Sequence, residues 1–401
     1  MKQHERVIIV GAGPVGLTAA LSLAQQGIPV LVLEAEPTLT HDLRAGSFHP
    51  PTLEMLATLD VTDEMLEQGY RVRQWQFRDR VEGTIVEWDL GILASETDFP
   101  YRLHLEQHRL TPILMRRLAA FPHAELLFSH PVRSLDQDTD TASVTCETSD
   151  GPKRFSGRWV IGADGGHSEV RKSLATAFEG FTWPERNVII STDYDLAQHG
   201  FAYNCYIADP QEWAGLFKVP HEGPPGLWRI GFPVPDDEPD EQALSPKGLQ
   251  SRLTRLLPWR NEYPVAYCSI YKVHQRVAAA WRRGRVLIAG DAAHLNNPVG
   301  AMGLNGGIHD AVNLTSKLGR VWRGEDDALL DLYVRQRRTA NVEFIQEGSI
   351  RNKRMLEERD PVLRAQRYDE LRAMAADPAR AHRHLLNTSM IASVRRAEAI
   401  T

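Results

Sequence analysis

Cysteine is scarce in this sequence, with three residues in a chain of 401. Cys146, Cys205 and Cys268 stand far apart and form neither a Cys-x-x-Cys pair nor a spacing typical of metal ligands. A disulfide framework and a cysteine-based metal centre are therefore excluded. We expect free thiols in a reducing cytoplasm, and no metal site.

Blocks of positive charge are lacking as well. The chain has 46 lysine and arginine residues against 52 aspartate and glutamate residues, for a formal net charge of -6. Nucleic-acid-binding proteins carry basic stripes or patches that this sequence does not show. We therefore expect no nucleic-acid partner.

A long uninterrupted apolar run is also missing. Residues 7–33 carry no charged side chain and follow Lys2 and Arg6, an arrangement that resembles a signal peptide. Glycines and prolines interrupt the stretch at positions 11, 13, 14, 16, 27 and 29. This punctuation suits a strand, a turn and a helix better than a signal segment or a membrane span. The sequence predicts a cytoplasmic protein without a membrane partner.

A β-α-β pattern stands at the N-terminus instead. Residues 6–10, with the sequence RVIIV, are typical of a buried parallel strand. Residues 14–26 are rich in alanine and leucine and predict a helix that Gly27 ends, and residues 29–36 predict a second strand. Units of this kind build dinucleotide-binding folds.

The first strand and the helix are joined by the sequence GAGPVG. Gly11 permits a tight turn, Gly13 lets the backbone approach a pyrophosphate, and Gly16 allows close packing of helix on strand. The helix start at Pro14 offers free N–H groups and a partial positive charge to phosphates. Glu34 can accept hydrogen bonds from ribose hydroxyls and disfavours a 2'-phosphate. The pattern predicts a bound dinucleotide but does not separate NAD from FAD.

Two later segments follow predicted strands in the same way. Asp164 lies in WVIGADGGHSEVRKSL (159–174), where it could contact a ligand or simply cap the next helix. Asp291 follows the strand of residues 284–289, and a carboxylate there points to the crevice in which doubly wound sheets bind ligands.

A second glycine-rich helix start follows Asp291. Gly303, Leu304 and Asn305 open a helix whose bare N-terminus suits a ring or carbonyl that gains negative charge. As an isolated fragment, GDAAH (290–294) could also be an ordinary strand end with a cap.

Together these segments resemble one family. GAGPVG with Glu34, ADGGHSEVR (163–171) and RVLIAGDAAHLNNPVGAMGLNGGIHDAVNL (285–314) are similar, in order and spacing, to the three fingerprints of class A flavoprotein aromatic hydroxylases. These single-component FAD monooxygenases include para-hydroxybenzoate hydroxylase and the phenylpropionate and resorcinol hydroxylases. Two more segments, LRAGSFHPPTLEML (43–56) and HLEQHRLTPILMRRL (104–118), also resemble family segments that contact the flavin.

The resemblance implies FAD as cofactor and NADH or NADPH as co-substrate. It implies that the reduced flavin adds oxygen at C4a and that the hydroperoxyflavin hydroxylates a phenolic or hydroxylated (hetero)aromatic acid. Asp164 would serve both FAD and NAD(P)H. Gly46 departs from the Ser or Arg of many relatives. The implied FAD-binding residues are Gly11, Gly13, Pro14, Gly16, Glu34, Arg44, Gln107, Asp164, Asp291, Gly303, Leu304 and Asn305.

The residues expected near the substrate are less sharply defined. Pro298 would form the ring-facing wall of the substrate pocket, and His294 could be a catalytic base, a cap, or a neighbour of the FAD phosphates. Aromatic and basic residues of the strand-rich region could line the pocket or simply pack in the core. Arg229 could bind a substrate carboxylate or form a structural salt bridge. The candidates are Tyr203, Tyr206, Phe217, Arg229 and Phe232.

The predicted fold is α/β, with a Rossmann-like FAD-binding lobe, an inserted, mostly antiparallel β lobe and a helical C-terminus. The FAD-binding lobe is assigned to residues 1–75, 100–180 and 276–320. Residues 76–99 and 181–275 are assigned to the substrate-binding lobe. Residues 321–401 form the helical region, which could cover the FAD lobe or make the contact of a homodimer.

Other functions remain open at this stage. A flavin halogenase should carry a WxWxIP element, which this sequence lacks. A reductase of the same fold, or a flavin-binding protein without activity, is not excluded. A NAD dehydrogenase would leave residues 285–314 without a purpose. The absence of a second GxGxxG agrees with nicotinamide that docks transiently.

Overall fold

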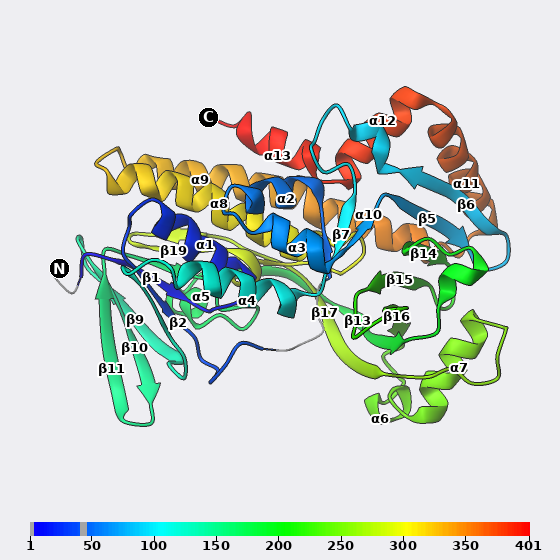
Figure 1. The fold of residues 1–401 in the computed structure, drawn as a ribbon, viewed down its shortest axis with the longest axis horizontal. Coiled ribbons are helices and arrows are strands. Elements are labelled where there is room, and N and C mark those ends of the chain that lie inside the picture. Colours follow the sequence, from blue (N-terminus) through cyan, green and yellow to red (C-terminus); the bar gives the residue numbers. More distant parts are fainter. Residues whose placement is uncertain (1–3, 41–45) are drawn as a thin grey trace.

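The computed structural model describes residues 4–40 and 46–401. It has the predicted α/β architecture, with two large sheets side by side and helices packed around them (Figure 1). One sheet holds the N-terminal β-α-β unit, and the other carries the strand-rich middle of the chain. The C-terminal helices cover parts of both.

The six-stranded sheet has the order β18-β19-β12-β1-β2-β8. All neighbouring strands run parallel except β18, which pairs antiparallel at the edge. Its central strand consists of β-branched residues that are almost completely buried, as a sheet covered on both faces requires. The strands are β1 (Val7–Val10), β2 (Val30–Leu33), β8 (Ala124–Leu127), β12 (Trp159–Gly162), β18 (Arg282–Arg283) and β19 (Val286–Ile288).

Helices cover this sheet. Helix α1 (Pro14–Gln25) connects β1 to β2 and packs against α4 (Gln107–Leu118) and α8 (Met302–Trp322). Helix α9 (Ala328–Ala340) lies on α8, on the side away from the sheet (Figure 1). The short strands and turn residues of 124–161 predict a hairpin meander. Only β9 (Val132–Gln137), β10 (Ala142–Thr148) and β11 (Gly151–Gly157) form a separate antiparallel sheet, whereas β8 and β12 pair in the parallel sheet.

The eight-stranded sheet has the order β20-β17-β13-β16-β15-β14-β5-β6 and is antiparallel except between β14 and β5. Helix α7 (Pro246–Leu256) packs over its middle and shares a core with it. The strands are β5 (Gln74–Asp79), β6 (Gly83–Asp89), β13 (Phe178–Thr192), β14 (Asn204–Ala208), β15 (Ala214–Val219), β16 (Leu227–Val234), β17 (Tyr267–Ala278) and β20 (His294–Leu295).

The C-terminal region is helical, as predicted. Strands β5 and β6 are covered by α11 and α12, with which they share a third core, and α13 packs against α9 (Figure 1). A π-helical turn at Asn341–Gln346 joins α9 to α10. The helices are α10 (Glu347–Leu356), α11 (Pro361–Ala376), α12 (Pro378–Thr388) and α13 (Ile391–Glu398).

The remaining elements are short. Strands β3 (Ser47–Phe48), β7 (Arg102–His104) and β4 (Tyr70–Val72) form a small sheet in that order, and α5 (Glu169–Ser173) and α6 (Asp240–Ala243) are single turns. The boundaries of the FAD-binding and substrate-binding lobes given above remain a prediction. In the described part of the chain, no helix combines the length and the apolar character needed to cross a bilayer.

One predicted helix is wrong in its extent. The leucine spacing of residues 50–68 predicts a single helix, but the structure has α2 (Pro50–Ala57) and α3 (Thr62–Gln68). Asp60 between them has φ of 58°, and a left-handed residue ends an α-helix. The leucines still face the core, so the spacing correctly predicts burial although not the break.

Candidate functional site

Four sequence-predicted residues lie in a row at the carboxyl edge of the six-stranded sheet. They follow the adjacent strands β2, β1, β12 and β19, and they are Glu34, Gly11, Asp164 and Asp291. All four line one cavity of about 470 Å³. This edge is where open parallel sheets bind ligands.

The glycine-rich turn has a different geometry at each glycine. Gly11 has φ of 102°, and a Cβ on it would lie 2.5 Å from the Ala163 carbonyl oxygen. A Cβ on Gly16 would overlap the Gly11 carbonyl oxygen, which explains the close packing of α1 on β1. A Cβ on Gly13 would meet no atom within 4 Å, and Gly13 lines the cavity at the N-terminus of α1. Gly13 and Pro14 thus leave room for a phosphate.

Glu34 and Asp164 are held in place by hydrogen bonds from nearby donors. One Glu34 carboxylate oxygen accepts a hydrogen bond from Ala12 N at 2.6 Å. Asp164 accepts hydrogen bonds from Ser168 Oγ and, at 3.1 Å, from Val170 N. Desolvation raises the pKa of Asp164 despite these hydrogen bonds. Asp164 therefore both caps the turn before α5 and lines the cavity, so the two readings of this residue are compatible.

The segment after β19 forms a second wall of the cavity. Asp291 and Leu304 line it, and Gly303 and Asn305 lie with Leu304 in the first turn of α8. The Asn305 side chain accepts from His49 N at 2.8 Å and Thr52 Oγ1 at 2.7 Å. Because its amide also donates to two backbone carbonyls, Asn305 fastens the start of α8 to α2 and β3.

His294 occupies a buried polar network. Its Nε2 lies 2.7 Å from Asp310 Oδ2, and its ring stacks on Trp281. Asp310 also accepts hydrogen bonds from Arg337 Nε at 2.8 Å and Gly290 N at 3.1 Å. His294 lines neither described cavity. This geometry gives no support to His294 as a catalytic base. It indicates a structural role, in which His294 and Asp310 support the backbone next to Asp291.

A second cavity lies beside the loop that carries Pro298. Val299, Gly300 and Met302 line it, together with Tyr206 of β14. The Tyr206 hydroxyl accepts a hydrogen bond from Gly300 N at 3.0 Å. Pro298 is exposed and lines neither cavity. Tyr206 is thus the predicted substrate residue that the structure brings to a cavity.

The other predicted substrate residues lie elsewhere. Arg229 is buried against Glu106, with Nη1 to Oε1 at 3.4 Å, and its guanidinium lies over the Phe217 ring. The alternative of a structural salt bridge therefore fits Arg229. Tyr203 packs beside Lys218 and Trp228, and Phe232 is fully buried in the core under α7.

Two further residues were predicted to bind FAD. Gln107, at the start of α4, lines the 470 Å³ cavity. Arg44 lies outside the described residues. Reasoning from sequence missed several residues of the second cavity. They are an arginine and aromatic residues on separate strands and a helix, and no motif in the sequence connects them. They are Trp75, Trp88, Arg102 and His384.

The first cavity has the features that FAD requires. It offers a bare helix start for the pyrophosphate at Gly13, a carboxylate for a ribose at Glu34, and a second helix start beside Leu304. No group of histidine, cysteine and acidic side chains suited to a metal ion occurs within residues 4–40 and 46–401. The donor set fits a dinucleotide.

Comparison with known proteins agrees with this geometry. Residues 4–347 match the family model described as FAD binding domain. Para-nitrophenol 4-monooxygenase of Pseudomonas sp. (strain WBC-3) is 36% identical over 370 residues, which are 91% of this chain and 90% of that protein. The 6-hydroxy-3-succinoylpyridine 3-monooxygenase HspB of Pseudomonas putida (strain DSM 28022 / S16) is 35% identical and covers 90% of this chain and 91% of its own.

A solved structure gives the same result for the fold. The crystal structure of p-nitrophenol 4-monooxygenase PnpA from Pseudomonas putida DLL-E4 superposes with a TM-score of 0.92 at 33% identity, over 98% of both chains. The family model, the relatives and the cavity at the sheet edge all agree. The chain belongs to the FAD-binding family of flavin-dependent aromatic monooxygenases.

Proposed function

We propose that the protein is an FAD- and NAD(P)H-dependent monooxygenase that hydroxylates a phenolic or hydroxylated heteroaromatic acid. One observation carries the proposal: a single segment contributes to both cavities. Asp291 and Leu304 line the dinucleotide cavity, and Val299, Gly300 and Met302, between them in sequence, line the aromatic one. This arrangement supports a ring substrate bound next to a flavin.

The cofactor carries the redox chemistry in this proposal. FAD bound in the first cavity would supply hydride transfer from NAD(P)H and the activation of molecular oxygen. The residues of this chain would bind the cofactor and orient it. Gly11, Gly13 and Glu34 would hold the ADP half of FAD, and Asp291 would bind the ribityl chain. The N–H groups at the start of α8 would stabilise negative charge on the flavin.

The relatives support the substrate class. Their names give para-nitrophenol and 6-hydroxy-3-succinoylpyridine as substrates, and both compounds are single six-membered rings with a hydroxyl and an electron-withdrawing substituent. The second cavity is lined with aromatic side chains and one cation, which suits such a ring. The dimer contact at the C-terminal helices stays a prediction that light scattering would test.

The test is oxidation of NADH and NADPH by purified protein with FAD, measured with and without a panel of phenols and hydroxypyridines. We expect oxidation to be stimulated by a substrate and a product that carries one added oxygen from O2. A chlorinated product in the presence of halide would favour a halogenase. Oxidation that no compound stimulates would favour a reductase, and FAD binding without any oxidation would favour a non-catalytic protein.

A further inference from the structure

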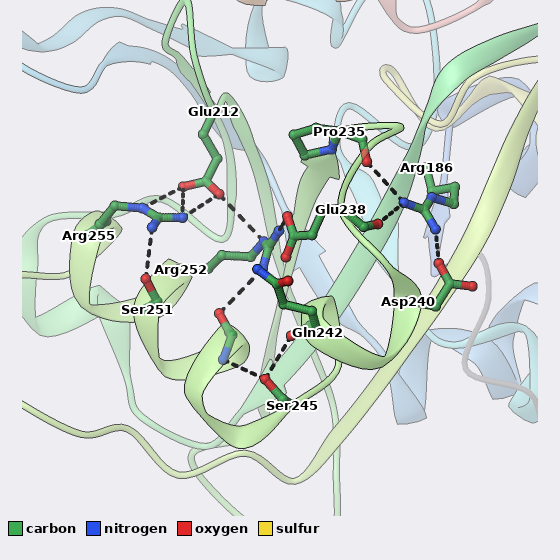
Figure 2. A network of polar contacts seen from close by, with 11 residues as sticks. Arg186, Glu212, Pro235, Glu238, Asp240, Gln242, Ser245, Ser251, Arg252 and Arg255 are labelled. Atoms are coloured by element: carbon green, nitrogen blue, oxygen red, sulfur yellow. Dashed lines mark hydrogen bonds and ion pairs between the residues drawn. The ribbon is translucent and has the colours of Figure 1, made fainter.

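Three of the five buried arginines in the described part of the chain pair with carboxylates, and a fourth, Arg171, donates to two backbone carbonyls and has Asp164 nearby. Arg252 of α7 lies between Glu238, at 2.6 Å from its Nη2, and Glu212, at 3.5 Å from its Nε (Figure 2). Arg337 pairs with Asp310 and Arg229 with Glu106, as described above. Such pairing is expected because a buried cation without a counter-charge is strongly destabilising.

Arg102 of β7 departs from this pattern. Its side chain is 2% exposed, yet no carboxylate in residues 4–40 or 46–401 forms an ion pair with it. Nη2 donates to the Thr388 carbonyl oxygen at 3.2 Å. Among the described residues, neither Nε nor Nη1 has a hydrogen-bond partner of normal geometry. Burial lowers the pKa of Arg102, and attraction to the nearby Tyr206 hydroxyl, with a weak hydrogen bond to it, opposes this shift only in part.

The surroundings of Arg102 are aromatic. Its guanidinium lies over the Trp75 ring at 5.6 Å from the ring centre. Trp75 stacks beside Trp88 at 6.0 Å, Trp88 stacks on His384 at 4.3 Å, and Tyr206 meets Trp75 edge-on at 6.2 Å. All five side chains line the second cavity. The indole N–H groups of Trp75 and Trp88 also have no partner within the described part of the chain.

We propose that Arg102 is the anion receptor of this cavity and determines substrate specificity by binding an ionised oxygen on a single aromatic ring. The ring lies among Trp75, Trp88 and His384, and the oxygen supplies the counter-charge that residues 4–40 and 46–401 do not. This inference rests on the proposed function, because it places the ring beside the Gly300 loop. The ionised oxygen is either a phenolate or a carboxylate.

The cavity is smaller than a single aromatic ring needs, so a ring enters only when the lining side chains shift. It measures about 50 Å³ and is closed on one side by α10, α11 and α12 through Met355, Leu371 and Thr388. An apolar cavity of about 150 Å³ holds benzene. A single ring therefore enters here when the lining side chains shift, whereas a fused ring system would have to displace the helices.

A structural role makes a different prediction. The hydrogen bond to Thr388 joins β7 to the last residue of α12, so Arg102 could simply fasten the C-terminal helices. In that case, replacing Arg102 would weaken the binding of charged and neutral rings equally. A receptor for an anion discriminates between them, and this difference is measurable by binding alone.

The experiment measures dissociation constants with FAD-loaded protein, from the change in flavin absorbance on titration. The probes are 4-nitrophenolate with its neutral methyl ether, and 4-hydroxybenzoate with its neutral methyl ester. For Arg102→Gln we expect binding of an anion to weaken about ten- to a hundredfold, which is the loss of one charge-assisted hydrogen bond. Binding of the matching neutral probe should change less than about threefold, and Arg102→Lys should recover part of the affinity.

The control is Arg252→Gln, which removes an equally buried arginine that lines neither described cavity. It should lower thermal stability and leave all four dissociation constants unchanged. A loss confined to nitrophenolate assigns the receptor to the phenolate, and a loss confined to hydroxybenzoate assigns it to the carboxylate. Equal losses for charged and neutral probes would overturn the inference, as would failure of the wild-type protein to bind either anion. The proposed function fails separately, if NAD(P)H oxidation is never stimulated.

Discussion

Gly13 allows the assignment of the dinucleotide cavity to be tested without disturbing the fold. The residue precedes α1 with φ of -69° and ψ of 178°, which alanine adopts without strain. A Cβ there meets no atom within 4 Å. Alanine is a poorer N-cap than glycine by about 0.5 kcal/mol, but it also reduces the entropy of the unfolded chain by a similar amount. The free energy of unfolding of FAD-free Gly13→Ala should therefore change by less than about 1 kcal/mol.

Affinity for FAD should respond quite differently. In the proposed placement of FAD, the added methyl group would occupy the space through which the pyrophosphate approaches the backbone. Loss of one hydrogen bond to a charged phosphate is worth about 1.5–3 kcal/mol, or about ten- to a hundredfold in Kd. Urea denaturation of the FAD-free protein and fluorescence titration with FAD measure the two effects separately.

Gly16→Ala is the matched control for Gly13→Ala. Its Cβ would overlap the Gly11 carbonyl oxygen, so α1 must move away from β1. We expect this variant to lose stability by about 1–3 kcal/mol even without FAD. Gly13→Ala protein that binds FAD within twofold of the wild-type affinity would refute the placement of the pyrophosphate.

Further predictions concern the segment after β19 and its support. Asp291→Ala should weaken FAD binding by about 1.5–3 kcal/mol, and flavin content unchanged after gel filtration would contradict the assigned role. Asp310→Asn leaves Arg337 buried without its counter-charge and should lower the free energy of unfolding by about 3–5 kcal/mol. Urea denaturation within 1 kcal/mol of wild type would show that the network relaxes. Desolvation raises the pKa of Asp310, but attraction to His294 and Arg337 outweighs it and holds the pKa below the usual value. The carboxylate therefore stabilises the fold above about pH 4 and loses this effect as the pH falls through its folded pKa. The difference in free energy of unfolding between wild type and Asp310→Asn should narrow below pH 4. A difference that widens there would be inconsistent with the lowered pKa.

The fold class and the dinucleotide cavity could be predicted because their signals are local. Gly11, Gly13 and Gly16 act within one turn, and each acidic residue of the cavity follows its own strand directly. Adjacency of four parallel strands then brings these short segments together at one edge. Local spacing was less informative for residues 50–68, since a single left-handed residue at Asp60 divides the helix.

The substrate side could not be predicted in the same way, because its residues come from distant parts of the chain. Arg102 meets Trp75, Tyr206 and His384 only after the eight-stranded sheet and α12 have packed together. Nothing around Arg102 in the sequence distinguishes it from Arg229, which has similar apolar neighbours. The distinction is the presence of Glu106 beside Arg229 and the lack of a carboxylate beside Arg102 among the described residues.

The polar residues of the segment 290–305 gain their meaning from this packing. His294 is fixed by Asp310 of α8, and Asn297 accepts from Val299 N and donates to Gln275 of β17. Asp291 lines the first cavity and Gly300 lines the second, and His294 and Asn297 lie between them in sequence. The contacts of His294 and Asn297 therefore hold the backbone that joins the two cavities. Small residues let the segment line both cavities, and the buried polar side chains keep it in one conformation. A change in His294 or Asn297 should therefore alter FAD binding and substrate binding together, whereas a change in Arg102 should alter substrate binding alone.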